Sequence, residues 1–230
     1  MCSSDLAGAS RIVYSPSGKA AALWFSSTGH VQVVKGLPAA PSARDTDASF
    51  LGGDPGALAV SDDGSWVMGA WAGQVYALGP DSAVKAVAVN GAAQALCFFH
   101  GSLNAAVITA NEVVTISDIG GGATPKTIWS KPEDAGQEAS AQTAVGLAVS
   151  FDNSRLTVAG SAGGLFTFDL ATGQSLGADC GCAPTALAGM GGSMFRLTSA
   201  QAGALKVFDA ATNEVWIVPL AVAADGGQQE

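Results

Sequence analysis

The residues in this chain best suited to chemistry are two cysteines one residue apart, Cys180 and Cys182. Zinc sites usually need about four ligands at suitable spacing, and His30 and His100 are the only histidines. A metal site is therefore not expected at this pair. Two states stay open: a short local disulfide, which would persist in an oxidising compartment, and two free thiols. Cys97 lies in an apolar run and is predicted to be a buried thiol that packs as a small hydrophobic side chain.

Carboxylates that could act as acids, bases or cation ligands occur in three places. Asp62 and Asp63 precede a glycine, which predicts a solvated turn rather than a catalytic pair. Asp45 and Asp47 are predicted to lie in a polar connection without the residue pattern of a calcium-binding loop. A third acidic set lies in the polar stretch 131–144, which predicts a flexible insertion: Glu133, Asp134 and Glu138.

The remaining residues that could belong to catalytic or phosphate-binding motifs lack the neighbouring sequence that those motifs require. His30 and His100 are each expected beside a turn. No serine lies in a G-x-S-x-G elbow. The glycine-rich stretches 120–122 and 189–192 do not open a helix, so neither predicts a phosphate-binding loop. We therefore expect no catalytic, cofactor-binding or metal-binding residues and no cofactor.

Composition narrows the class of protein further. The chain has 230 residues, of which 48% are hydrophobic and only 13% charged, with 30 glycines. No stretch approaches the roughly 20 apolar residues of a membrane-spanning helix. The net charge is −9, and the ten basic residues are scattered singly from Arg11 to Lys206, which argues against nucleic acid as a partner. The short apolar runs, broken by Gly, Asp, Ser and Pro, indicate a globular fold of short elements.

Two sequence elements repeat along the chain. Leu58-Ala59-Val60-Ser61 recurs as residues 147–150, and a turn signal follows each copy. The segment 164–173 aligns with 204–213, and both contain an Asp followed three residues later by Thr. Such an Asp accepts hydrogen bonds from backbone N–H groups two or three residues on, and the Gly or Asn after the Thr takes a positive φ to close a hairpin.

Each repeat is predicted to hold four short strands. In the second unit these strands are 57–61, 65–71, 74–78 and 83–89, with hairpins between them. Four strands per 40–50 residues is typical of β-propeller blades, so we predict an all-β propeller with five blades, at about 10–52, 53–92, 93–138, 139–182 and 183–220. Residues 1–9 and 221–230 lie outside it. The tryptophans are expected to pack between blades: Trp24, Trp66, Trp71, Trp129 and Trp216.

Several of these segments resemble a known family. The stretches 58–65 and 168–173 resemble YVTN/WD40-like β-propeller repeats of bacterial exported proteins, over about residues 10–220. Residues 180–185, together with 195–198, are similar to uncharacterised exported propeller proteins of soil bacteria, chiefly acidobacteria. The resemblance implies a propeller fold and an exported protein, and it implies no particular activity.

The start of the chain suggests an incomplete ring. Residues 2–6 match the translation of a common sequencing-adapter end, so we expect residues 1–6 to be non-native and the natural protein to begin upstream. No spare strand is predicted to pair across a closing seam. We therefore expect a larger ring of about seven blades that has lost upstream blades, and self-association of the isolated chain.

The predicted function is a non-catalytic scaffold or recognition module, which binds an unknown protein or small molecule at one mouth of the propeller. Two alternatives stay open. A propeller hydrolase or lactonase would need a metal or acid–base cluster at the central channel, where the inner strands offer mostly Ala, Leu, Val, Gly and Cys. A quinoprotein-like redox module would need a quinone cofactor.

Overall fold

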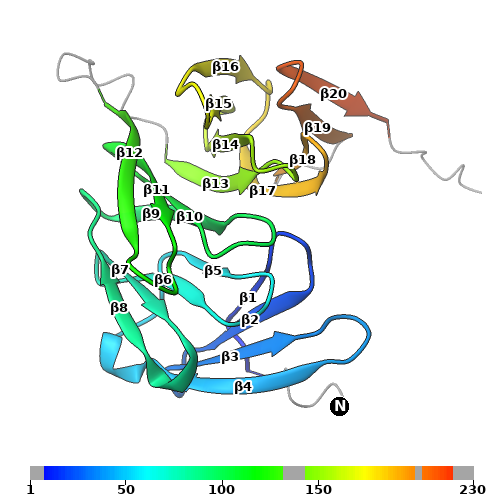
Figure 1. Ribbon diagram of the computed structural model, residues 1–230. Helices are drawn as coiled ribbons and strands as arrows, with labels where there is room; N and C mark the ends of the chain where they lie inside the picture. Colours follow the sequence, from blue (N-terminus) through cyan, green and yellow to red (C-terminus); the bar gives the residue numbers. More distant parts are fainter. Residues whose placement is uncertain (1–7, 132–142, 200–203, 220–230) are drawn as a thin grey trace, which may run out of the picture.

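The computed structural model describes residues 8–131, 143–199 and 204–219. Predictions for residues 1–7, 132–142 and 220–230, including those for Glu133, Asp134 and Glu138, concern segments outside this part of the chain. The described residues form five sheets of four antiparallel strands, each built from strands consecutive in sequence (Figure 1). We number these sheets blades 1 to 5 in chain order. The predicted all-β propeller of four-stranded blades is confirmed.

In every blade the four strands lie side by side in sequence order, with the first strand innermost and the fourth outermost (Figure 1). Blade 1 holds β1 (Arg11–Tyr14), β2 (Ala20–Phe25), β3 (His30–Lys35) and β4 (Ser42–Asp47). Blade 2 holds β5 (Leu58–Val60), β6 (Val67–Trp71), β7 (Gln74–Leu78) and β8 (Val84–Val87). Blade 3 holds β9 (Ala93–Phe98), β10 (Ala105–Thr109), β11 (Glu112–Ser117) and β12 (Thr124–Ser130). Blade 4 holds β13 (Ala144–Val149), β14 (Arg155–Gly160), β15 (Gly164–Asp169) and β16 (Ser175–Asp179). Blade 5 holds β17 (Pro184–Gly191), β18 (Met194–Ser199), β19 (Leu205–Asp209) and β20 (Glu214–Val218).

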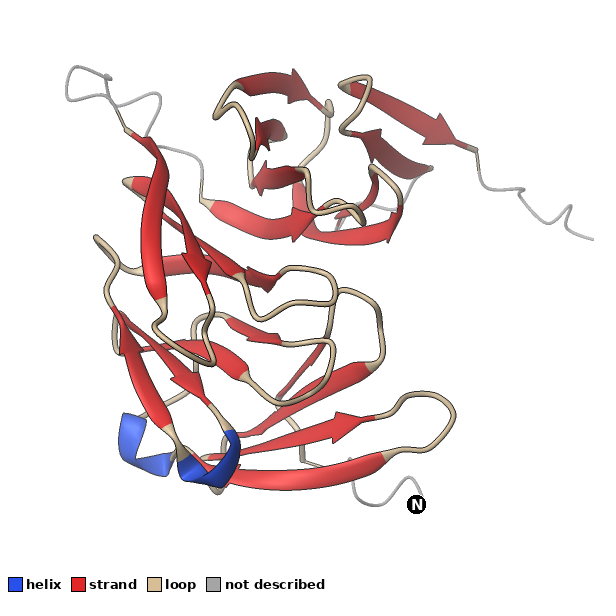
Figure 2. Cartoon of the chain, in the orientation of Figure 1, coloured by secondary structure: helices blue, strands red, loops and turns tan. Residues whose placement is uncertain are grey.

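Helix is confined to two short 3-10 turns within the described residues, η2 (Ser49–Leu51) and η3 (Pro80–Ser82), both drawn in blue in Figure 2. One prediction near them is wrong. Asp45 and Asp47 do not lie in a polar connection, because residues 42–47 form β4, the outer strand of blade 1. Its partner β3 supplies a ladder of backbone hydrogen bonds from His30 to Lys35, so an edge strand forms despite its polar sequence.

The repeated Asp-x-x-Thr turns form as the sequence predicts. The Asp169 carboxylate accepts hydrogen bonds from the N–H groups of Ala171 (3.1 Å) and Thr172 (2.8 Å). Gly173 follows with a φ of 73°, and Asn213 takes a φ of 61° at the matching position in blade 5. Each turn therefore satisfies its own backbone and reverses the chain between the third and outer strands of its blade.

The hydrophobic core consists of layers between neighbouring blades. Trp24 of blade 1 and Trp71 of blade 2 meet edge to face with 5.9 Å between ring centroids, inside a cluster that both blades share. Trp66 lies in the layer between blades 2 and 3, and the half-buried Trp129 packs against the layer between blades 3 and 4. The prediction is wrong for Trp216, which is half exposed on β20 because no described blade follows to cover it.

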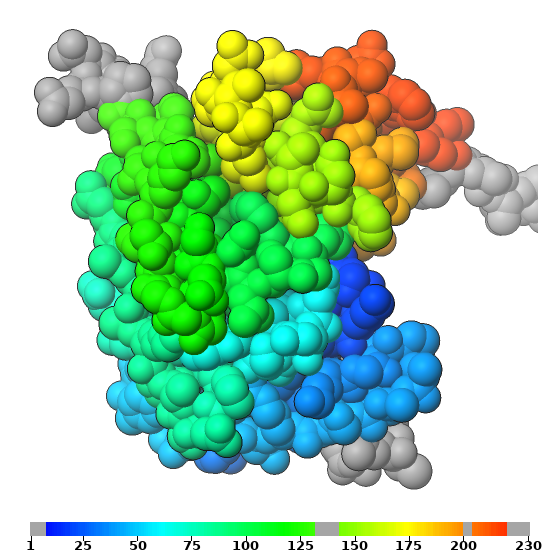
Figure 3. All heavy atoms as spheres, viewed as in Figure 1, coloured from blue at the N-terminus to red at the C-terminus, as the bar shows by residue number. Residues whose placement is uncertain are grey.

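The five blades follow one another around an arc. Their inner strands β1, β5, β9, β13 and β17 lie towards the centre of the view in Figure 1. Contacts between blades run chiefly from each blade to the next in sequence. The space-filling view is hollowed on the side between blade 1, in blue, and blade 5, in orange and red (Figure 3). Within the described residues, no strand of one blade pairs with a strand of another.

Candidate functional site

The turns that join the inner strand of each blade to its second strand form one connected surface. We call these the inner turns, and they comprise residues 15–19, 61–65, 99–103, 150–154 and 192–193. Because all five blades have the same strand order, these turns leave the inner strands at the same end and gather around one mouth of the arc. Each inner turn is bonded to the next one along the chain, as the following contacts show.

Asp62 joins the inner turns of blades 1, 2 and 3. Its carboxylate accepts hydrogen bonds from the N–H (2.8 Å) and the hydroxyl (2.7 Å) of Ser17, in blade 1. Its other oxygen accepts from the N–H of Gly101, in blade 3, at 2.8 Å. Partial burial opposes ionisation, but the hydrogen bonds from Ser17 and Gly101 outweigh it and hold the pKa of Asp62 below its usual value. Asp62 lies in a turn as predicted, but its carboxylate is bonded to two other blades rather than simply solvated.

His100 and Asn153 join blades 3 and 4. The side-chain oxygen of Asn153 accepts from the N–H of His100 (2.8 Å), and its amide donates to the carbonyl of His100 (2.9 Å). The His100 ring also packs against the Phe151 ring, with 5.1 Å between centroids. The N–H of Phe151 then donates to the carbonyl of Gly192 in blade 5, at 2.8 Å. The bonded series therefore runs through all five blades.

Two of the inner turns are also braced internally in the same way. Asp63 accepts hydrogen bonds from the hydroxyls of Ser61 and Ser65 and from the N–H of Ser65. Asp152 makes the equivalent bonds in blade 4, where those from its two neighbouring serines hold its pKa at about 2. These side chains brace the two turns from within.

The inner turns expose side chains of mixed chemistry, with Lys19, Asp63 and Asp152 exposed beside large apolar groups. Phe151 is largely exposed, and so is Met190, at the end of β17 beside the last inner turn. The half-exposed His100 packs against Phe151, with the two ring planes tilted by 51°. Phe151 and Met190 offer large apolar side chains that suit contact with an apolar or aromatic group.

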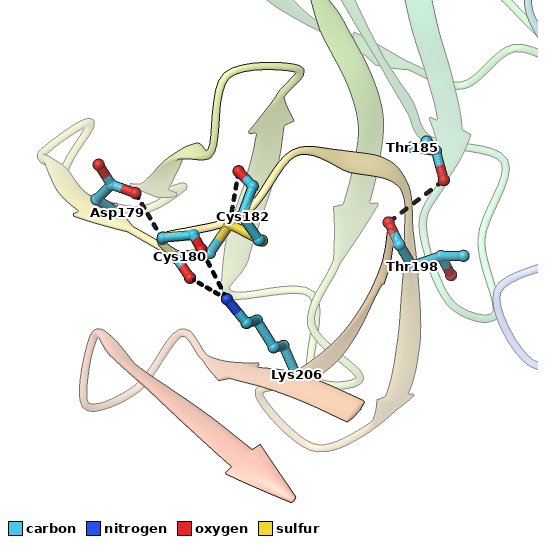
Figure 4. Close-up of a disulfide and its surroundings, with 7 residues drawn as sticks. Asp179, Cys180, Cys182, Thr185, Thr198 and Lys206 are labelled. Carbon is cyan, nitrogen blue, oxygen red and sulfur yellow. Dashed lines mark hydrogen bonds between the residues drawn. A yellow bond between two sulfur atoms is a disulfide. The ribbon is translucent and has the colours of Figure 1, made fainter. Parts of the chain in front are cut away.

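The predicted cysteine pair lies elsewhere. Cys180 and Cys182 are joined in a disulfide in the connection between β16 and β17 (Figure 4). The N–H of Cys180 donates to Gly163, in the turn between β14 and β15 (3.0 Å). That turn leaves the blade at the end opposite to the inner turns, because neighbouring strands are antiparallel. Lys206 of blade 5 donates to the carbonyls of Cys180 and Gly181, each at 2.8 Å, and so ties blade 5 to this connection.

The remaining candidates do not converge. Cys97 is buried and free as predicted, and burial raises the pKa of its thiol to about 12. His30 begins β3 as expected and lines a shallow depression on the side of blade 1, with Gln32 and Asp45, far along the chain from His100. Across the described ranges, no group of three or more His, Cys, Asp or Glu residues is placed to hold a metal ion.

The sequence did not predict the hydrogen bonds that connect the inner turns of neighbouring blades. The signal that was present is the repeated Ser-x-Asp-x-Ser pattern at residues 61–65 and 150–154, which predicts self-bonded turns. The contacts of Asp62 with Ser17 and Gly101 bridge 45 and 39 positions of sequence. Nothing in local sequence indicates a partner so far away. As to membranes, no helix in the described part of the chain is long and apolar enough to cross one.

Comparisons with solved structures place the fold among β-propellers. The β-propeller domain of Cps50 (Swd1) from Myceliophteria thermophila matches with a TM-score of 0.65 at 15% identity, over 95% of this chain and 68% of that chain. Kuenenia stuttgartiensis hydrazine synthase matches with a TM-score of 0.61 at 16% identity, again over 95% and 68%. The dihydro-heme d1 dehydrogenase NirN, solved in complex with DHE, matches with a TM-score of 0.56 at 17% identity, over 94% and 49%.

At these identities the likeness shows the β-propeller fold alone. No protein-family model matches the chain, and neither does any curated protein sequence. The three structures include a propeller domain and two enzymes by name, so the shared fold does not assign an activity.

Proposed function

We propose that this protein is a non-catalytic recognition module that binds a protein or small-molecule partner on its inner turns. The observation that carries the proposal is the continuous series of hydrogen bonds through the inner turns of all five blades, from Ser17 through Asp62 and His100 to Gly192. A surface held in this way loses little entropy when it binds.

The side chains on this surface support binding rather than reaction. Phe151 and Met190 are exposed although both are large and apolar, and the ring of Phe151 is held by its contact with His100. Exposed aromatic anchors on a rigid support are typical of recognition sites. Asp62 has both carboxylate oxygens engaged in structural hydrogen bonds, so it is poorly placed to act as a general base.

Site-specific photo-crosslinking tests this proposal. A photoreactive phenylalanine analogue replaces Phe151 in one variant and Val84 in a matched control, because Val84 is also exposed but lies on β8, the outer strand of blade 2. Both are incubated with an extract of the source organism. We expect one defined species crosslinked at position 151 and not at 84. The purified species should then bind the parent protein, and Phe151→Asp should weaken that binding at least tenfold. The same products at both positions, or none at 151, would contradict the proposal.

We also propose that the protein is exported and that its blades are of the YVTN/WD40-like type found in exported proteins of soil bacteria. The Cys180–Cys182 disulfide supports export, since disulfides persist mainly in oxidising compartments. The repeated Leu-Ala-Val-Ser element supports the blade type. Thiol counting on protein isolated from its native host under alkylating conditions tests export. We expect only Cys97 among the described cysteines to react after unfolding, and reactive Cys180 and Cys182 would argue for a reducing compartment.

A further inference from the structure

The Cys180–Cys182 disulfide lies at the junction between blades 4 and 5, at the opposite end of the blades from the inner turns. Cys180 is 6% exposed and belongs to the hydrophobic cluster that the two blades share. Cys182 is half-buried and packs against that cluster. The two cysteines therefore differ in their surroundings, and a reagent in solution reaches Cys182 first.

The disulfide contributes little to holding this connection in place. It joins residues at a sequence separation of 2, and the constraint that a disulfide places on the unfolded chain is smallest for such short loops. Hydrogen bonds hold the same backbone without it. The N–H of Cys180 donates to Gly163 at 3.0 Å, and the N–H of Gly181 donates to the Asp179 carboxylate at 2.7 Å. We therefore expect the connection to keep its path when the bond between the sulfur atoms is broken.

The surroundings also accommodate two thiols. The sulfur of Cys180 lies 3.5 Å from the carbonyl oxygen of Cys182, so a thiol formed there has a hydrogen-bond acceptor nearby. The Cys182 side chain is half-buried and can turn outward once the sulfur atoms separate. Reduction of the disulfide therefore requires no unfolding of either blade.

A positive charge is held against this connection. The Lys206 ammonium donates to the carbonyls of Cys180 and Gly181, each at 2.8 Å, and Figure 4 shows it directed at the connection that carries both sulfur atoms. The Asp179 carboxylate is the opposing charge on the same connection, and it is engaged by the N–H of Gly181. A buried thiolate is poorly solvated, so Cys180 is a poor leaving group unless a cation lies close to it. Lys206 supplies that cation.

We propose that Cys180 and Cys182 form a thiol–disulfide exchange site that oxidises a dithiol of another molecule. A thiolate of the dithiol bonds to the sulfur of Cys182, and the bond between the two cysteines breaks. The electron pair leaves on Cys180, beside Lys206, and the Cys180 thiolate takes up a proton. The second thiolate of the dithiol then attacks its own partner sulfur and releases Cys182, which is protonated in turn. The dithiol loses two electrons and becomes a disulfide, while the cysteine pair gains two electrons and becomes two thiols.

Reduction without denaturant tests whether the pair reacts in the folded protein. The full chain carrying Cys2→Ser is incubated with dithiothreitol, and the loss of the disulfide is followed by mass spectrometry. Cys97 is the internal control, because it is buried and free, and its alkylation without denaturant measures how often the fold opens. We expect the pair to be reduced while Cys97 stays unmodified and the far-UV circular dichroism is unchanged. Reduction no faster than Cys97 alkylation would mean that the disulfide opens only through unfolding, and would overturn the proposal.

A monothiol identifies the sulfur that is attacked. Reduced glutathione has no second thiol, so the reaction stops at the mixed disulfide. Alkylation of the released thiol and peptide mass spectrometry then locate the adduct. We expect glutathione on Cys182 and the alkyl group on Cys180. The reverse assignment, or no adduct, would overturn the proposal. A peptide with two reduced cysteines, compared with dithiothreitol at equal concentration, shows whether a peptide or a small dithiol is oxidised faster.

Substitution of Lys206 tests the role of its charge. We expect Lys206→Gln to slow reduction at least about threefold, because the exchange rate depends on the stability of the leaving thiolate. Lys206→Arg should restore the rate. Lys85→Gln is the matched control, since Lys85 donates to the carbonyls of Gly120 and Gly121, each at 2.7 Å, at the junction between blades 2 and 3. An unchanged rate in Lys206→Gln, or an equal decrease in Lys85→Gln, would refute the role of Lys206.

Discussion

Asp62 and Asp63 are neighbours in sequence, but their carboxylates accept hydrogen bonds from different parts of the molecule. Asp63 bonds only within its own turn, to Ser61 and Ser65. Asp62 bonds to Ser17 and Gly101, which belong to the blades on either side. Hydrogen bonds to an ionised acceptor are among the stronger ones in proteins. The residue that joins three blades is thus distinguished from its neighbour only by where its partners lie.

Substitution of the two aspartates should separate these roles. We expect Asp62→Ala to lower the free energy of unfolding by about 1 to 2 kcal/mol, since it removes three hydrogen bonds at a partly solvated site. Amide hydrogen exchange should accelerate at Ser17 and Gly101. Asp63→Ala, the matched control, should accelerate exchange at Ser65 and leave Ser17 and Gly101 unchanged. Equal effects of both variants on Ser17 would refute the bridging role.

Stability should fall in acid because the turn aspartates have lowered pKa values. The pKa of Asp152 is about 2, and hydrogen bonds also hold four others below their usual range: Asp62, Asp63, Asp169 and Asp209. In the unfolded chain an Asp titrates near about 3.9, so the unfolded state binds more protons below that pH. The stabilisation is complete above about pH 4 and is lost as the pH falls towards about 2.

Thermal melting as a function of pH measures this effect. We expect a constant melting temperature from about pH 7 to 5 and a progressive decrease between about pH 4 and 2. Asp152→Asn should flatten part of that decrease, because it removes a carboxyl whose pKa is lowered to about 2. A melting temperature that rises on acidification over this window would show that the turn carboxylates do not stabilise the fold.

At the scale of elements, the contact between β2 and β6 is the clearest example of how blades are held together. Trp71 is fully buried and meets Trp24 edge to face. Ala20 and Ala22 lie in the same layer, and their small side chains leave room for the two indoles. Aromatic rings fill the space between two twisted sheets, which widens away from the central axis.

Two tryptophan substitutions compare a fully buried indole with a half-exposed one. We expect Trp71→Ala to cost about 3 to 5 kcal/mol, because it leaves a large cavity between blades 1 and 2. Trp216→Ala should change stability by less than about 0.5 kcal/mol, since the side chain is half exposed. Urea unfolding at a concentration where the chain is monomeric checks both. A large cost for Trp216→Ala in the monomer would mean that its ring is packed within the chain.

At the scale of the whole molecule, the blades differ in how much of each is covered. Blades 2 and 3 pack against a neighbour on both sides, and their second strands β6 and β10 are buried along their whole length. Among the described residues, blade 5 shares a hydrophobic cluster with blade 4 alone, and β20 is mostly exposed. In a protein built of stacked repeats, each unit is stabilised chiefly by the interfaces with its neighbours.

Native-state hydrogen exchange should therefore be graded along the chain. We expect the slowest exchange in β6 and β10 and the fastest, among inner and second strands, in β17 and β18. Limited proteolysis should likewise cleave within blade 5 before blades 2 and 3. Uniform exchange across all five blades would show instead that the arc unfolds as one cooperative unit.

Local sequence determined most of the secondary structure and the four-stranded form of the blades. Leu58-Ala59-Val60-Ser61 and the turn after it form an inner strand and a self-bonded turn, and the Asp169 turn closes with Gly173 at positive φ. These features depend on residues within a few positions of one another, so propensity and turn chemistry suffice to predict them. The polar segment that forms β4 was predicted to be a connection. It forms a strand because it pairs with β3, and its own composition does not indicate that pairing.

Tertiary structure alone decided which side chains meet and which stay open to solvent. The pairing of Asp62 with Ser17, the contact of His100 with Phe151 and the exposure of Trp216 all depend on which blade lies beside which. The sequence shows two aspartates in a turn, a histidine after a phenylalanine and a tryptophan in a strand. Only the curvature of the arc brings distant turns together at one mouth, because that curvature arises from the packing of whole sheets and not from any local run of residues.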